Sequence, residues 1–347
     1  MQDFGGGDEI RFERMGKAGV VTLTRPKALN AVTHGMVLAL SKALDAWGAD
    51  DAVELVVLKA EGRAFCAGGD IMRVYEAGKA GRPIAVFFHD EYLLNAQIAR
   101  FAKPYVSLID GIVMGGGAGI SVHGSHRVMT ENAIFAMPEV GIGFFPDIGG
   151  SYFLPRLKGE FGLYLGLTGE RIRNGDALWS GLATHAVAAA DLGTVFDELC
   201  ATGRPDAVLK AHASSPSRET HDAAVHAIND AFAPSDLAGI IAGLESAPED
   251  EFRQRTLATL LKRSPTSLNV VCRQVRAGAM LSMNECMVME FRIVNRMLEG
   301  HDFYEGIRAA IVEKGSTPIW RPSTLAEVDP TEIERYFSPL PQGDLAL

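Results

Sequence analysis

A glycine-dense, apolar stretch, residues 104–157, limits the folds that are open to this chain. Tyr105–Ile109 predicts a short buried strand, and Asp110-Gly111 predicts a turn after it. The run 115–119, Gly-Gly-Gly-Ala-Gly, then leads into residues 118–122, which predict the first turn of a buried helix. Unpaired N–H groups at a helix start, approached closely through glycines, favour an anionic oxygen as ligand. The alternative is that these glycines only permit tight packing between a strand and a helix.

Two carboxylates, Glu139 and Asp147, follow in apolar surroundings. An ionised acid among Phe, Ile and Met is costly to bury unless it is paired or used. Two glycines and a proline separate the acids and allow the chain to reverse, which would bring the carboxylates together. The alternative for Asp147 is that it caps a helix beginning near Gly150.

Two motifs stand out in the first half of the chain: Ala-Phe-Cys-Ala-Gly-Gly-Asp-Ile at 64–71 and the glycine run at 115–119. Together they resemble the crotonase (enoyl-CoA hydratase/isomerase) superfamily. Further motifs are Met-Pro-Glu at 137–139, Phe-Pro-Asp-Ile-Gly-Gly at 145–150, Tyr-Phe-Leu-Pro-Arg-Leu at 152–157, and the segments 262–268 and 302–308. These resemble a narrower thioesterase branch of that superfamily, the 3-hydroxyisobutyryl-CoA hydrolases, and the similarity extends over nearly the whole chain.

This resemblance implies an α/β fold, a crotonase-type spiral of strand–strand–helix turns with a helical C-terminal region. Residues 1–157 would hold the spiral core with the CoA and acyl sites. Residues 158–347 would hold the remainder of the core and the mainly helical region. Strand patterns at 10–15, 20–24 and 55–59 agree with such a core.

The resemblance also assigns a site. The N–H groups of Gly69 and Gly116 would be the two oxyanion donors. CoA would be held by Lys27, Ala28, Leu29, Ala67, Gly68, Gly69, Asp70 and Ile71. Arg25 and Lys27 would meet phosphates of the coenzyme, or would be solvated loop charges.

The acids distinguish the reaction within the superfamily. Hydratases use two glutamates, of which one matches Glu139 and the other falls at Gly119, which has no side chain. Asp147 stands where hydratases typically have a glycine. The substrate contacts would come from Glu91, Gly116, Glu139 and Asp147, with Glu91 touching a hydroxyl of the acyl group or tuning Asp147.

We therefore expect an enzyme that hydrolyses the thioester of a short branched 3-hydroxyacyl-CoA. The substrate implied by the resemblance is 3-hydroxyisobutyryl-CoA, giving 3-hydroxyisobutyrate and CoA in valine catabolism. Glu139 would be nucleophile or general base, and both roles remain open. An enoyl-CoA hydratase or isomerase, a non-catalytic acyl-CoA binder and a structural interaction protein are the alternatives.

Composition narrows the remaining classes. A net charge of −10 argues against nucleic acid as partner, and no apolar run approaches the ~20 residues of a membrane span. The acidic start lacks a transit pattern, so we expect a cytoplasmic location. The four cysteines show no CxxC spacing and the histidines no HExxH motif, so we expect no metal. No cofactor is expected beyond the coenzyme A of the substrate, and a homo-oligomer is possible.

Overall fold

The protein was analysed as a computed structural model that describes residues 2–82 and 85–347. The packing divides it into two units, each built from three separate segments. The first unit comprises the residues up to Asp70, Asp90–Phe135 and Ile172–Glu219; the second comprises Ile71–His89, Ala136–Arg171 and Thr220–Leu347. The division at residue 157 expected from the sequence stays a prediction.

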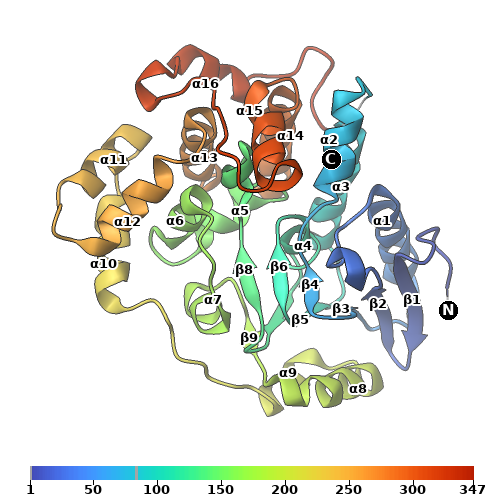
Figure 1. The fold of residues 1–347 in the computed structure, drawn as a ribbon. Helices are drawn as coiled ribbons and strands as arrows, with labels where there is room; N and C mark the ends of the chain where they lie inside the picture. The colour runs from blue at the N-terminus through green and yellow to red at the C-terminus, as the bar shows by residue number, and fades with distance from the viewer. Residues whose placement is uncertain (1, 83–84) are drawn as a thin grey trace. The chain divides into compact units, whose positions relative to one another are not determined.

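A six-stranded sheet forms the frame of the first unit (Figure 1). Its order is β1 (Ile10–Met15), β2 (Ala18–Leu23), β3 (Leu55–Ala60), β5 (Tyr105–Ile109), β7 (His126–Met129) and β9 (His185–Ala186). β1 pairs with β2 in antiparallel fashion, and every later pair in the sheet is parallel. The strands expected at 10–15, 20–24 and 55–59 are therefore present, with ends that shift by one or two residues.

A second, three-stranded sheet has the order β4 (Ala64–Cys66), β6 (Ile112–Met114) and β8 (Ile134–Ala136). Successive turns of the chain add one strand to each sheet: β3 is followed by β4, β5 by β6, and β7 by β8. This repetition is the spiral of strand–strand–helix turns that the sequence predicts, so the predicted fold class is confirmed. The sequence patterns did not predict β4 and β6, which are three residues long and adjoin glycine-rich loops.

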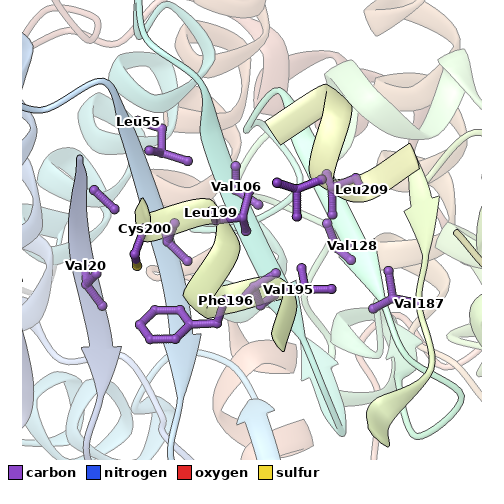
Figure 2. Close-up of a cluster of buried hydrophobic side chains, with 14 residues drawn as sticks. Val20, Leu55, Val106, Val128, Val187, Val195, Phe196, Leu199, Cys200 and Leu209 are labelled. Atoms are coloured by element: carbon purple, nitrogen blue, oxygen red, sulfur yellow. The ribbon is translucent and has the colours of Figure 1, made fainter. Parts of the chain in front are cut away.

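Apolar side chains fasten helices to the large sheet (Figure 2). α8 (Leu192–Thr202) contributes Val195, Phe196 and Leu199, and α9 (Pro205–Ala211) contributes Leu209. The strands contribute Val20, Leu55, Val106 and Val128, and Val187 follows β9. Each fully buried side chain of this size stabilises the fold by about 1.5–3 kcal/mol. This packing stabilises the large sheet from which the loops after the strands extend.

Two helices of fifteen residues, α1 (His34–Gly48) and α3 (Ala85–Ala99), contribute to the first unit. α1 begins where Thr33 Oγ1 accepts the N–H of Met36, as the sequence predicts. α3 passes from the second unit into the first. A helix was expected at 84–101, and residue 84 lies outside the described residues.

The second unit is mainly helical, which confirms the predicted helical C-terminal region (Figure 1). Its helices include α2 (Ile71–Lys79), α5 (Gly150–Phe153), α6 (Phe161–Thr168), α10 (Asp222–Ala231), α11 (Leu237–Glu245), α12 (Glu251–Leu260), α13 (Pro265–Gly278), α14 (Met283–Met297), α15 (His301–Ile307) and α16 (Pro330–Phe337). α13 has the bounds that its sequence pattern predicts. Among the helices of the described residues, none has the length and apolar character to cross a bilayer.

Candidate active site

Two glycines of the first unit bring their backbone amides close together. Gly69 follows β4, and Gly116 is the first residue of the short helix α4 (Gly116–Gly119) after β6. A Cβ atom built on Gly116 would lie 2.9 Å from the Gly69 nitrogen. Within the described part of the chain, neither amide donates a hydrogen bond. Each N–H group can therefore donate to a ligand.

Backbone conformations that favour glycine create this approach. Gly115 precedes α4 with φ of 46°, and Gly68 precedes Gly69 with φ of 126°. Hydrogen bonds then hold the Gly68–Asp70 segment against Val32: Val32 donates to the Gly68 carbonyl over 2.8 Å, and Asp70 donates to the Val32 carbonyl over 2.9 Å. The loop is therefore fixed before any ligand arrives.

Glu91 lies beside the glycine pair. Its side chain, on α3, is 2% exposed, and Oε1 would lie 3.0 Å from a Cβ on Gly116. A buried carboxylate so close to Gly116 is suited to accept a hydrogen bond from a hydroxyl of a bound molecule. The structure therefore brings Gly69, Gly116 and Glu91 together, as the sequence predicts.

Of the eight residues expected to hold CoA, all but Ile71 belong to the first unit. Ala67 donates to the carbonyl of Leu29 over 3.0 Å, so the 27–29 segment borders the 67–70 loop. Lys27 and Ala28 are exposed in a single 3-10 turn, and contact of Lys27 with a phosphate stays a prediction. Ile71, the last residue of the predicted set, begins α2 and belongs to the second unit.

Arg25 is occupied within the chain. It forms ion pairs with Glu9 over 3.2 Å and with Asp70 over 3.1 Å, and its side chain is 16% exposed. Arg25 was expected to contact a phosphate or to be a solvated loop charge, whereas these ion pairs give it a role in supporting the loop. The sequence reasoning gave no structural role to Asn30, a buried residue with φ of 56°. Its side-chain Nδ2 donates to the carbonyls of Glu61 and Ala64, each over 2.8 Å.

The second unit carries the two acids. Glu139 begins the turn Glu139–Ile142, which Gly143 ends with φ of 66°; Phe144 then donates to the Glu139 carbonyl over 3.1 Å. The chain reverses here as expected. Glu139 and Asp147 are 8% and 5% exposed. Both acids are therefore withdrawn from water.

Electrostatics couple the two carboxyl groups. Burial raises the pKa of Glu139 well above 4.5, and the charge of Asp147 raises that pKa further. Within the described residues, Glu139 Oε2 makes no hydrogen bond. A buried, weakly solvated carboxylate with a raised pKa is a stronger base than an exposed one, which suits it to activate water or to attack a carbonyl.

Asp147 is not the cap of a helix. α5 begins after Gly149, whose φ is 85°, and no side chain caps it. Ile148, between Asp147 and Gly149, also has a positive φ of 51°. The loop is bound instead by Gln274 and Glu290, two buried side chains that sequence reasoning missed.

Two side chains of reactive types, Cys66 and His126, are held within the structure. Burial raises the pKa of the Cys66 thiol to about 12, so the thiol stays protonated at neutral pH. His126 is bonded to Ser125 Oγ over 2.9 Å and to Asp206 over 3.1 Å. Among the described residues, no three His, Cys, Asp or Glu side chains gather as metal ligands would.

A family model described as enoyl-CoA hydratase/isomerase matches residues 18–337. The chain belongs to the enoyl-CoA hydratase/isomerase family. Curated relatives in the family include proteins named 3-hydroxyisobutyryl-CoA hydrolase, mitochondrial. The one from Danio rerio is 44% identical, with 98% of this chain and 92% of the relative covered. The one from Homo sapiens is 41% identical, with 97% and 90% covered. The branch that the sequence motifs indicate is therefore confirmed.

Two crystal structures of family members have the same fold. A carnitinyl-CoA dehydratase from Mycobacterium thermoresistibile has a TM-score of 0.92 at 40% identity, over 97% of this chain and 98% of that chain. An enoyl-CoA hydratase from Rhodobacter sphaeroides 2.4.1 has a TM-score of 0.86 at 37% identity, over 98% and 100%. These two proteins are named as a dehydratase and a hydratase, whereas the curated relatives are named as hydrolases.

The expected cytoplasmic location is contradicted, because the curated relatives of this family carry the word mitochondrial in their names. The expectation rested on the acidic composition of the first residues. Targeting segments are removed from mature proteins and contribute nothing to the folded enzyme, so the composition of a folded domain does not report its compartment.

Proposed function

We propose that the protein hydrolyses the thioester of a short branched 3-hydroxyacyl-CoA, foremost 3-hydroxyisobutyryl-CoA, and so serves valine catabolism. The products are 3-hydroxyisobutyrate and free CoA. The observation that carries this proposal is the arrangement of acids: Glu139 and Asp147 are both buried and are coupled, while position 119 has no carboxylate. Two-glutamate hydration lacks one of its acids in this chain, whereas hydrolysis with Glu139 and Asp147 does not.

The backbone amides of Gly69 and Gly116 hold the thioester oxygen in this proposal. That oxygen becomes negative when the carbonyl carbon turns tetrahedral, and two donors at 2.7–3.1 Å stabilise it as it does so. Their support is the absence of any competing acceptor in the described residues. One such donor typically changes kcat ~10²–10³-fold.

Glu139 activates the attack. As general base it takes a proton from water, whose oxygen bonds to the carbonyl carbon. As nucleophile it bonds to that carbon itself, and water then opens the mixed anhydride. In both routes the C–S bond breaks, CoA leaves as thiolate and takes up a proton. Asp147 orients the water or the substrate hydroxyl, and Glu91 contacts that hydroxyl.

Hydration of an enoyl-CoA is the second candidate, favoured by the names of the two similar crystal structures. The test offers the purified protein 3-hydroxyisobutyryl-CoA, isobutyryl-CoA and crotonyl-CoA, with free thiol and enoyl absorbance recorded together. Thiol release that is fastest with 3-hydroxyisobutyryl-CoA supports hydrolysis. Loss of enoyl absorbance without thiol identifies a hydratase, and CoA-ester binding without turnover identifies a non-catalytic binder.

CoA is part of the substrate in this proposal, and no separate cofactor takes part. A homo-oligomeric assembly remains a prediction from the family resemblance. Sedimentation of the purified protein measures its oligomeric state directly.

A further inference from the structure

The loop that carries Asp147 is hydrogen-bonded on both sides of this residue to polar side chains of the C-terminal helices. Gln274 lies on α13 and Glu290 on α14, and both helices contact α5, which follows the loop. Each of these side chains is 0% exposed. We call Gln274 and Glu290 the loop clamp.

The clamp forms three hydrogen bonds with backbone atoms of the loop. Gln274 Nε2 donates to the carbonyl of Pro146 over 2.6 Å, immediately before Asp147. The amide of Gly149 donates to Glu290 Oε2 and that of Ser151 to Glu290 Oε1, each over 2.8 Å. Asp147 is thus held on both sides within a segment of six residues, although the clamp residues lie more than 120 positions further along the chain.

The clamped backbone is one that a free loop would avoid. Ile148 adopts a φ of 51°, a left-handed conformation that is rare for a β-branched residue. Such strain persists only where the surrounding structure fixes it, and it clusters at functional sites. Burying a carboxyl is also unfavourable: it raises the pKa of Glu290 to about 8, although the two amide donors favour the ionised form.

We propose that Glu290 and Gln274 are positioning residues that set the direction of the Asp147 carboxylate for hydrolysis. The inference rests on the proposed function, because it gives Asp147 its role. Neither clamp residue touches the reacting atoms. Each acts through the backbone on one side of Asp147, where a misplacement of about 1 Å can lower a rate ~10²-fold.

The test replaces each clamp residue without changing its size. Glu290→Gln places an amide NH₂ against one backbone N–H, and Gln274→Met removes the donor to Pro146. Both variants should lower kcat for 3-hydroxyisobutyryl-CoA by about 10–100-fold with little change in KM. The matched control is Asp176→Asn, another buried carboxyl that accepts a backbone amide, that of Glu219 over 3.0 Å. It should lower thermal stability but leave kcat as in the wild type.

A double variant shows whether Glu290 acts through Asp147. Residues that act as one unit are strongly non-additive, so E290Q/D147N should hydrolyse the thioester as slowly as D147N alone. Rates are recorded with enzyme in excess, so that slow hydrolysis is still measured. Losses that multiply would overturn the inference. So would wild-type kcat in E290Q or in Q274M.

Failure of the proposed function has a different signature. In that case the wild-type protein itself releases no thiol from 3-hydroxyisobutyryl-CoA. A wild type that hydrolyses this substrate, with clamp variants that lose thermal stability but keep kcat, would overturn the positioning role alone. If E290Q does not fold, Q274M and its double variant with D147N decide the question by the same criteria.

Discussion

Replacing Gly116 by alanine tests the oxyanion site directly. The added methyl carbon would lie 2.9 Å from the amide nitrogen of Gly69 and 3.0 Å from Glu91 Oε1. An oxygen that accepts a hydrogen bond from an N–H group lies at the same distance from the nitrogen, 2.7–3.2 Å. The methyl group would therefore crowd the amide that holds the thioester oxygen in the proposed mechanism.

The size of the effect follows from this geometry. Loss of a single oxyanion donor costs ~10²–10³ in kcat. Since the methyl group would crowd the Gly69 amide, the kcat of the Gly116→Ala variant should fall by about 10²-fold or more, as for the loss of one donor. The close contact with backbone also crowds the loop, and overpacking of this kind costs about 1–3 kcal/mol of stability. Some loss of thermal stability should accompany the loss of rate.

The assay measures thiol release at saturating 3-hydroxyisobutyryl-CoA together with thermal unfolding. The control is Gly35→Ala in α1, where the nearest atom to the new Cβ, Thr33 Oγ1, is 3.8 Å away. This variant should keep its kcat and gain roughly 0.4–1 kcal/mol of stability, because alanine restricts the unfolded chain. A folded Gly116→Ala protein with a kcat near that of the wild type would refute the oxyanion assignment.

Three further predictions concern the acids and the helix packing. The rate of hydrolysis should rise with pH through the raised pKa of Glu139, because only the ionised carboxylate is a base or nucleophile. In the D147N variant, the residual rate should rise at a lower pH, because the charge of Asp147 no longer raises the pKa of Glu139. A rise at the same pH as in the wild type would show that the two acids are not coupled. Glu91→Ala should slow 3-hydroxyisobutyryl-CoA more than isobutyryl-CoA, since a site built for a hydroxyl discriminates by it; an unchanged ratio of the two rates would remove Glu91 from that contact. Gly278→Ala would place a Cβ 1.8 Å from the Ser151 carbonyl oxygen and should lower the urea midpoint by at least the equivalent of ~1–3 kcal/mol, whereas an unchanged midpoint would contradict the close packing of α13 on α5.

Local patterns in the sequence predicted the elements that are specified locally. Thr33 before an apolar helical pattern predicts the start of α1, and the pattern that begins at Pro265 predicts that of α13. The structure adds the cap of α13, where Ser264 Oγ accepts the Ser267 amide over 3.1 Å. The reversal between Glu139 and Asp147 was also predictable, because glycine and proline mark it. The three-residue strands β4 and β6 were not, since so short a segment has no measurable period.

The clamp could not be located from the sequence. Gln274 and Glu290 are more than 120 residues from the backbone atoms that they bind, and no local pattern encodes such a contact. One signal was present: Glu290 stands between Met289 and Phe291 within the buried pattern of α14. A glutamate on the apolar face of a helix needs a polar partner. Its position therefore indicates a buried polar contact but not which residues form it.

The alternation of the chain between its two units governs how the protein can be made and altered. The chain passes from one unit to the other after residues 70, 89, 135, 171 and 219. A nascent chain therefore lacks the last segment of the first unit until residue 219 has been synthesised, and folding must await contacts between distant parts of the sequence, which is intrinsically slow. An engineer who wishes to exchange one unit for that of a relative must replace three separate segments at once. No single crossover point transfers the amides of Gly69 and Gly116 without also transferring residues of the unit that carries Glu139 and Asp147.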